Sequence, residues 1–287
     1  MKVVIPDDYQ DAVRHLECFG KLAAHEVTIY DHSRIDDDVE ALVLIRERTP
    51  ITASLLDRLP RLRLIAQTGR GTAHIDIDAC ERRGIEIATG TGSPYAPAEL
   101  TFALILASMR RIPQEAASAR AGRWQSGLGT TLRGRTLGIW GYGKIGTLVA
   151  DFGRAFGMHV IHSQAQSREE LLEQSDVLSL HLRLSDRTRH RITADDLARM
   201  KPAALLVNTA RAELIAPGAL VAALRAGRPG FAAVDVFEEE PTSNDPLLTM
   251  DNVLATPHLG YVERDSYELY FGQAFDAVND FAEGATS

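Results

Sequence analysis

The stretch TLGIWGYGKIGTLVADFGRAFGMHVIHS, at residues 136–163, decides how this chain is expected to fold. Its first five residues, 136–140, have the apolar character of a buried strand and run directly into GYGKIG at 141–146. A helical pattern with one apolar face follows, and a second strand is predicted from residue 158. A strand, a glycine-rich turn, a helix and a second strand in this order predict a parallel βαβ unit.

Short apolar runs alternate with helical patterns on both sides of this unit. Towards the N-terminus, strands are predicted at 2–6, 26–30, 41–45, 62–67 and 85–89, with helices at 9–19, 52–59 and 77–83. Towards the C-terminus, strands are predicted at 158–163, 177–182, 204–209, 231–237 and 253–258. Further helices are predicted at 98–111 and 114–121. This regular alternation indicates an α/β protein with two doubly wound parallel-sheet domains.

Composition narrows the class of protein. The chain has 287 residues, of which 45% are hydrophobic and 24% charged, and this balance excludes a disordered or fibrous protein. The net charge of −8 argues against a nucleic-acid partner. No apolar run approaches the ~20 residues of a membrane-spanning helix, and the N-terminus is not typical of a signal peptide. With Cys18 and Cys80 as its only cysteines, the chain is expected to be cytoplasmic.

The glycine-rich turn has the spacing of a dinucleotide-binding motif, and it lies between a predicted strand and a predicted helix. Gly141 allows the tight turn, Gly143 lets a pyrophosphate approach the backbone, and Gly146 lets the helix pack against the strand. The helix begins at Lys144 and Ile145, and its free N–H groups favour a phosphate. A plain strand-to-helix turn is the alternative. The motif predicts a domain of the Rossmann type.

The domain boundaries follow from this assignment. Residues 99–260 are expected to form the dinucleotide-binding domain, and residues 1–98 and 261–287 together a substrate-binding domain. The last helical pattern, 263–281, is expected to pack back on the first domain because chain termini often lie close together.

The acidic residue that usually grips the adenosine ribose, ~20 positions after the first glycine, is missing. The strand ends instead at Ser163 and Gln164, which are able to hydrogen-bond a ribose, and Arg168 follows. No carboxylate is there to repel a 2′-phosphate, so the sequence leaves NAD and NADP both open as cofactors.

Three polar residues each follow a predicted strand of the second domain, where ligands of such sheets bind. Arg211 offers a flat fork that grips a carboxylate. His258 has the ring that titrates near neutrality, and Glu240 would favour its protonated form. Each residue also has an ordinary interpretation, as a surface cation, a loop histidine or part of an acidic run. Their joint placement is typical of an enzyme that transfers a hydride to a 2-keto acid.

The chain resembles the D-isomer-specific 2-hydroxyacid dehydrogenases, a family that includes D-3-phosphoglycerate dehydrogenase. The resemblance covers nearly the whole chain and rests on motifs in the right order: GRWQ at 122–125, TLGIWGYGKIG at 136–146, MKPAALLVNTAR at 200–211, AAVDVFEEEP at 232–241 and TPHLG at 256–260. It implies an NAD(P)-dependent oxidoreductase that transfers a hydride between nicotinamide and a small D-2-hydroxy acid or 2-keto acid.

The resemblance also assigns roles to residues. Arg211 would bind and polarise the substrate, Glu240 would support His258, and His258 would be the acid/base. Asp235 would hold the nicotinamide carboxamide, and Gly260 would leave room for the ring.

Substrate contacts and assembly are implied in the same way. The TGRG loop, with Arg70 and Gly71, would bind the substrate carboxylate through backbone N–H groups, and no metal is implied. The region 98–135 would form the contact of a homodimer.

The chain departs from the family pattern at several places, one of which is Arg183, where the family commonly has a proline after the strand histidine, here His181. Ala212 stands where the family usually has glycine. Only twelve residues separate Ser163 from Asp176, where the family places a helix, a strand and another helix. A parallel crossover needs about a dozen residues, so one edge strand is expected to be lost. Either natural trimming or an omitted segment accounts for the short 164–175 connection.

The substrate remains open at this stage. Arg46 and Arg48 match a basic segment that phosphoglycerate enzymes use near the substrate phosphate, so a 3-phosphoglycerate-like substrate is considered. A solvated turn containing Glu47 is an equally good interpretation of that segment. A second function class is an NAD-binding sensor or interaction protein with weak or no catalysis, because the fold alone does not separate it from an enzyme.

Overall fold

The computed structural model describes residues 1–284 and divides the chain into two compact units. One unit comprises residues 1–93 together with the C-terminal segment from 262, and the other comprises residues 94–261. The division precedes the whole of helix α3 (Tyr95–Met109), which therefore belongs to the second unit. Among the residues described, no helix is both long and apolar enough to cross a membrane.

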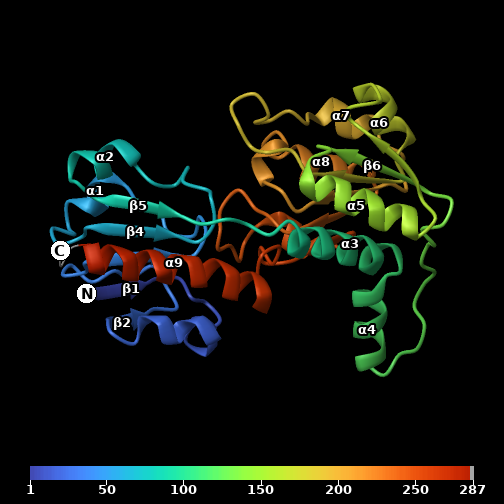
Figure 1. Cartoon of the computed structure of the whole chain (residues 1–287). Coiled ribbons are helices and arrows are strands. Elements are labelled where there is room, and N and C mark those ends of the chain that lie inside the picture. The colour runs from blue at the N-terminus through green and yellow to red at the C-terminus, as the bar shows by residue number, and fades with distance from the viewer. Residues whose placement is uncertain (285–287) are drawn as a thin grey trace. The chain divides into compact units, whose positions relative to one another are not determined.

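The first unit is built on a parallel sheet (Figure 1). Its strand order is β2-β1-β3-β4-β5, with β1 at Lys2–Ile5, β2 at Glu26–Ile29, β3 at Ala41–Leu44, β4 at Leu64–Gln67 and β5 at Glu86–Thr89. The central strands β3 and β4 are buried on both faces, which explains their continuous apolar sequences. Helices α1 (Ala53–Leu56) and α2 (Ile77–Arg82) contribute to the core on one face.

The C-terminal helix α9 (Arg264–Gly284) contacts β3, β4 and β5 of the first unit, as its apolar spacing predicts. Its buried Phe271 and Phe275 pack ring to ring with centroids 5.6 Å apart.

The second unit contains a six-stranded parallel sheet in the order β11-β10-β9-β8-β6-β7. The strands are β6 (Thr136–Trp140), β7 (His159–His162), β8 (Val177–Leu180), β9 (Leu205–Asn208), β10 (Phe231–Val234) and β11 (Val253–Ala255). One core contains residues of α3 and α5 (Lys144–Ala155). The other contains residues of α6 (Arg168–Gln174), α7 (Ala194–Arg199) and α8 (Ala219–Arg225). Cores on both faces confirm the doubly wound α/β prediction.

The sheet has lost one edge strand, as the short connection predicted. In the usual order 3-2-1-4-5-6, a further strand lies outside the second one, whereas here β7 is itself the edge. Helix α6 follows directly and begins with a capping box, in which Ser167 and Glu170 each accept a hydrogen bond from the other's backbone N–H. The chain then crosses to β8 on the other side of β6.

Two segments differ from the predicted helices. The helix expected over 9–19 is instead two short 3₁₀ helices, Val13–His15 and Glu17–Leu22. The Asp8 carboxylate accepts hydrogen bonds from the N–H groups of Ala12 and Val13, which holds a tight turn where an α-helix was expected. Helix α3 begins three residues before the predicted start at 98.

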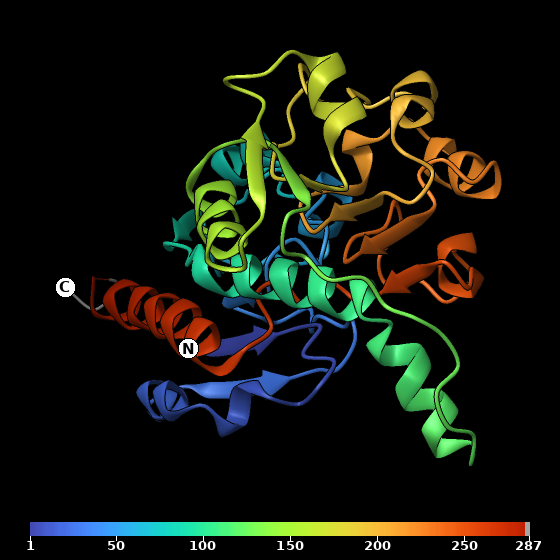
Figure 2. The same ribbon diagram turned by 90° about the vertical axis from the view of Figure 1, so that its right-hand side faces the viewer.

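Helix α4 (Ile112–Arg120) and the irregular loop after it form an arm that projects from the sheet of the second unit (Figure 2). The arm is braced internally, because Ser126 N–H and Oγ donate to the Glu115 carboxylate at 2.9 and 2.7 Å. Three of its apolar side chains are exposed, Ile112 by 54%, Trp124 by 82% and Leu128 by 95%.

Candidate active site

Two glycines of the turn between β6 and α5 are required by packing. Gly141 has φ +110°, and a Cβ there would lie 2.5 Å from the backbone carbon of His181. A Cβ at Gly146 would lie 2.3 Å from the carbonyl oxygen of Gly141. The close turn and the close approach of helix to strand therefore account for these two positions.

Gly143 is different, because no contact among residues 1–284 requires a glycine there. Its φ of −99° is accessible to any residue, and none of their atoms that bear on the question lies within 4 Å of the position that a Cβ would occupy. This open space lies at the N-cap of the twelve-residue α5. A helix N-terminus with room for close approach suits the pyrophosphate of a dinucleotide. The turn thus fits NAD.

The carboxyl ends of β9, β10 and β11 lie side by side. Asn208 is in register with Val234, and Val234 with Ala255. Arg211, Glu240 and His258 follow these strands within a few residues. All three predicted catalytic residues therefore lie at the carboxyl end of one sheet.

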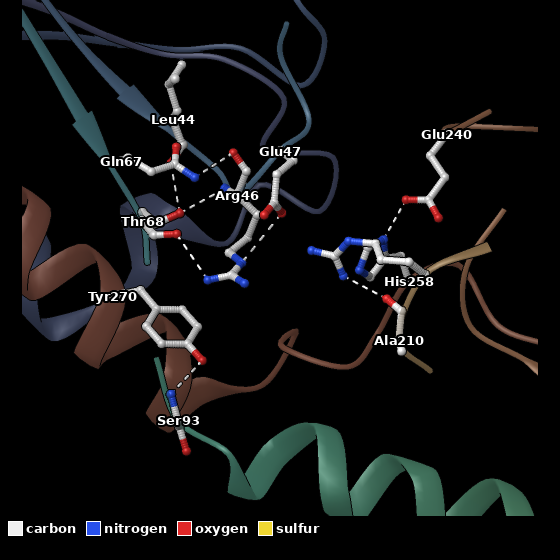
Figure 3. Close-up of polar contacts among 11 residues, drawn as sticks. Leu44, Arg46, Glu47, Gln67, Thr68, Ser93, Ala210, Glu240, His258 and Tyr270 are labelled. Carbon is white, nitrogen blue, oxygen red and sulfur yellow. Dashed lines mark hydrogen bonds and ion pairs between the residues drawn. The ribbon is translucent and has the colours of Figure 1, made fainter. Parts of the chain in front are cut away.

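Glu240 and His258 are in direct contact (Figure 3). His258 Nδ1 lies 2.5 Å from Glu240 Oε2, and the other carboxylate oxygen accepts a hydrogen bond from Phe237 N–H at 2.8 Å. The Phe237 N–H group thereby holds the Glu240 carboxylate in place, and Glu240 orients the His258 ring through Nδ1. Nε2 is then the nitrogen left for proton exchange with a substrate.

The buried carboxylate of Asp235 organises the loop that carries His258. It accepts hydrogen bonds from Thr256 Oγ1 at 2.6 Å, Leu259 N–H at 2.7 Å and Gly260 N–H at 2.9 Å. Burial raises the pKa of Asp235, and these hydrogen bonds oppose that rise. The observed contacts make Asp235 a positioning residue for His258, and the contact with the nicotinamide carboxamide that the resemblance implies stays a prediction.

The Arg211 loop is held by Asn208, which sequence reasoning missed. Asn208 Nδ2 donates to the carbonyl oxygen of Arg211 at 2.9 Å, and Asn208 Oδ1 accepts from Ala210 N–H at 3.1 Å. The Arg211 guanidinium donates to the carbonyl oxygen of Ala210 at 2.7 Å. A signal was present, since Asn208 ends the otherwise apolar strand LLVN.

Ser163 and Arg168, which the sequence places near the adenosine ribose, both make contacts within the protein. Ser163 Oγ accepts a hydrogen bond from Gly141 N–H at 3.1 Å, so this hydroxyl braces the turn itself. Arg168 is committed elsewhere, because its Nε donates to Asp196 at 2.7 Å and its Nη2 also pairs with that carboxylate.

In the first unit, the TGRG loop packs against Arg46 and Glu47 (Figure 3). A Cβ at Gly69 would lie 1.9 Å from Arg46 Nη1, and one at Gly71 would lie 2.1 Å from Glu47 Oε1. The two glycines therefore make room for this pair of charged side chains. Arg46 also donates to the Thr68 carbonyl oxygen at 3.3 Å, whereas Arg70 is exposed.

Arg46 and Arg48 both have aromatic neighbours within the first unit. The Arg46 guanidinium lies over the Tyr270 ring, 5.5 Å from its centroid. Arg48 lies 4.4 Å from the centroid of Tyr9 and donates to the carbonyl oxygen of Asp7 at 2.6 Å.

Two other histidines, His181 directly after β8 and His74 after the TGRG loop, also offer imidazole rings for acid/base chemistry. Burial lowers the pKa of His181 to about 4, and its Nε2 lies 2.9 Å from Ser179 Oγ. Burial also lowers the pKa of His74, and neither ring nitrogen has a hydrogen-bond partner among the described residues. Both rings are neutral near pH 7, and neither is paired with a carboxylate as His258 is.

The comparisons with known proteins agree with this geometry. Residues 102–260 match the model of the D-isomer specific 2-hydroxyacid dehydrogenase NAD binding domain. A glyoxylate reductase of Aeropyrum pernix is 42% identical over 259 residues, covering 82% of this chain and 77% of the relative. The chain belongs to the D-isomer specific 2-hydroxyacid dehydrogenase family. It is thus an NAD-dependent oxidoreductase that acts on CH–OH donors.

Two other similar proteins are named as phosphoglycerate enzymes. A D-3-phosphoglycerate dehydrogenase of Methanocaldococcus jannaschii is 37% identical over 91% of this chain, which spans only 53% of that relative. A phosphoglycerate oxidoreductase structure from Vibrio cholerae has 50% identity and a TM-score of 0.95, covering 99% of both chains. These two chains are nearly equal in length, which fits a natural short connection at 164–175.

Proposed function

We propose that this dehydrogenase reduces small, unphosphorylated 2-keto acids of the glyoxylate and hydroxypyruvate class to D-2-hydroxy acids, with His258 as the proton donor. The 2.5 Å contact between His258 and Glu240 carries the proposal. It supplies an imidazole that is held in one orientation by a carboxylate, at the edge of the sheet where Arg211 also lies.

In the proposed reaction, the glycine turn would hold NADH, which would supply a hydride to the keto carbon. Glu240 orients the His258 ring through Nδ1, and Nε2 gives its proton to the keto oxygen, so that a hydroxyl forms. The Arg211 guanidinium grips the substrate carboxylate and polarises the carbonyl group. In the direction of oxidation, the neutral His258 ring accepts the proton from the hydroxyl.

The proposed substrate class rests on the first-unit loop and on the relatives. Glu47 lies against Gly71, where its charge opposes a second anionic group on the substrate. Arg48 is already engaged with Asp7 and Tyr9. Relatives named glyoxylate reductase, of Aeropyrum pernix and Thermococcus litoralis, are 42% and 37% identical to this chain.

A phosphorylated substrate is the second candidate, because Arg46 and Arg48 flank Glu47 and several relatives are named phosphoglycerate enzymes. The hypothesis of a non-catalytic sensor has less support. The shortened cofactor domain favours it, but the His258–Glu240 contact on which the enzymatic proposal rests is intact.

We further propose a cytoplasmic homodimer formed through the arm and helix α3. The exposed Ile112, Trp124 and Leu128 give this region the apolar surface that a subunit interface buries.

The decisive test is NADH oxidation in the presence of glyoxylate, hydroxypyruvate, phenylpyruvate and phosphohydroxypyruvate. We expect the highest kcat/KM with the first two substrates. Preference for phosphohydroxypyruvate, lost in Arg46→Ala and Arg48→Ala variants, would favour the second candidate. NADH binding without turnover of any 2-keto acid would contradict the enzymatic proposal.

A further inference from the structure

The strand that should select the cofactor lacks the residue that usually does so. A carboxylate at the end of the second Rossmann strand normally hydrogen-bonds the ribose hydroxyl of NAD and repels the 2′-phosphate of NADP. Between Phe156 and Arg168, a segment that includes all of β7, the sequence contains no Asp or Glu. The carboxylate that would select NAD over NADP is therefore absent from the end of β7.

A neutral amide lies beside the glycine turn instead. Gln164, an exposed residue, donates from Nε2 to the carbonyl oxygen of Tyr142 at 3.3 Å. Tyr142 is the residue between Gly141 and Gly143, so this hydrogen bond ties the strand end to the turn that suits the pyrophosphate. An amide both donates and accepts, and it neither repels nor neutralises a phosphate.

The position of Gln164 is fixed by the short connection itself. The His162 ring stacks on Tyr142 with centroids 4.0 Å apart and planes 12° from parallel. His162 N–H donates to Gln166 Oε1 at 2.9 Å, and Ser167 then caps α6. Residues 162–167 thus hold their conformation through their own side chains.

The arginine that follows β7, whose charge would favour NADP, is also committed elsewhere. The Arg168 guanidinium pairs with Asp196 and lies 5.7 Å from the centroid of the Trp140 ring. Arg154 pairs with Asp151 at 2.6 Å and donates to the Tyr142 hydroxyl at 3.2 Å. Both guanidinium groups would have to leave existing partners to reach a 2′-phosphate.

We propose that this dehydrogenase binds NADPH about as tightly as NADH, and that the neutral Gln164 sets this lack of selectivity. The proposal rests on dinucleotide binding at the turn beside Gly143. It predicts that an acidic substitution at Gln164 makes the protein selective for NADH and that a basic substitution makes it selective for NADPH.

The test is calorimetric titration of the full-length protein with NADH and with NADPH, without substrate. For the unaltered chain, we expect dissociation constants that agree within about threefold, which is under ~1 kcal/mol. Gln164→Glu adds a carboxylate of nearly the same shape and should weaken NADPH by at least about tenfold relative to NADH. Gln164→Arg should shift the ratio towards NADPH.

Gln174→Glu is the matched control, because it makes the same charge change at the exposed end of α6. Its ratio of dissociation constants should equal that of the unaltered chain. A preference of about tenfold or more for either nucleotide in the unaltered chain would overturn the inference and leave the proposed function intact. So would an unchanged ratio in both Gln164 variants. Failure of both nucleotides to bind would instead overturn dinucleotide binding itself.

Discussion

At the scale of single residues, the proposed mechanism divides the acid/base task between Glu240 and His258. Glu240 is anchored by Phe237 N–H through one oxygen and contacts His258 Nδ1 through the other. Its position fixes which ring nitrogen faces away from it. Charge and orientation are separable, because an amide of the same shape keeps the hydrogen-bonding position and loses the charge.

We therefore predict that Glu240→Gln lowers kcat for keto-acid reduction while NADH affinity stays nearly unchanged. The amide keeps the hydrogen-bonding position beside Nδ1 but removes the carboxylate charge beside the ring that donates the proton. The measurement is kcat at a single pH, with Glu239→Gln as a control that removes a neighbouring exposed charge. Equal losses of kcat in both variants would mean that general surface charge, and not the contact with His258, is responsible.

Gly143 allows a test of cofactor binding that leaves the fold unchanged. Gly143→Val places a side chain in space that the chain leaves open, so thermal stability should change little. The same side chain would occupy the approach to α5, and NADH affinity should fall by at least about tenfold. Calorimetric titration measures this, with Gly20→Val as a control at another open glycine. Unchanged NADH affinity would rule out binding at this turn.

Sequence reasoning indicated the candidate residues that follow a recognisable pattern and missed a residue that is evident only from its contacts. Strand ends and motif spacing indicated Arg211, Glu240 and His258. Asn208, which holds the Arg211 loop, became evident only from its hydrogen bonds. Arg168 is near the ribose position in sequence, but its pairing with Asp196 on α7 depends on a tertiary contact that no local pattern encodes.

At the scale of elements, the parallel strands were predictable because their apolar runs are buried on both faces. Predicted and observed strands differ mainly at their ends, as for 41–45 and β3. The expected helix over 9–19 failed because a side chain competed for its backbone. Asp8 accepts the N–H groups of Ala12 and Val13, a competition that apolar spacing does not reveal.

Strand β8 leads to a histidine whose burial makes stability depend on pH. The pKa of His181 is lowered from its ordinary 6.5 to about 4, so the unfolded chain takes up a proton first as pH falls. The stability that the neutral His181 ring gives the folded chain is fully present at pH 7. It is lost as the pH drops through 6.5 towards 4. Lowering the pH from 7 to about 4.5 should cost ~2 kcal/mol through this group.

His181→Gln should lose this part of the pH dependence, because the amide does not titrate. The measurement is urea unfolding of both proteins at the two pH values. If the unaltered chain and the variant lose the same free energy of unfolding on acidification, His181 is not the group responsible.

At the scale of the whole molecule, each unit carries a different proposed role. The first unit holds the loop of Arg46, Glu47 and Gly71, and the second holds the glycine turn and the acid/base pair. The family resemblance predicted this division of labour. The substrate class is a finer property, and in the proposed function it depends on how Glu47 balances the charges of Arg46 and Arg48.

Assembly is also a property at this scale. If the arm forms the dimer contact, Leu128→Asp should convert the dimer to a monomer, because it adds a charge to apolar surface that the dimer would bury. Light scattering coupled to size-exclusion chromatography measures the mass in solution. Leu248→Asp, which changes an exposed leucine outside the arm, should leave the dimer intact. A dimer that survives the Leu128 change equally well would place the contact elsewhere.

The central claim is that His258 donates the proton while the cofactor site acts independently of it. The most direct measurement is a single turnover, in which protein preloaded with NADH is mixed with glyoxylate and NADH fluorescence is followed. For His258→Gln we predict a rate about 10²–10⁴-fold below that of the unaltered enzyme, with nearly unchanged NADH affinity. A near-normal rate in His258→Gln, with NADH bound, would contradict the account.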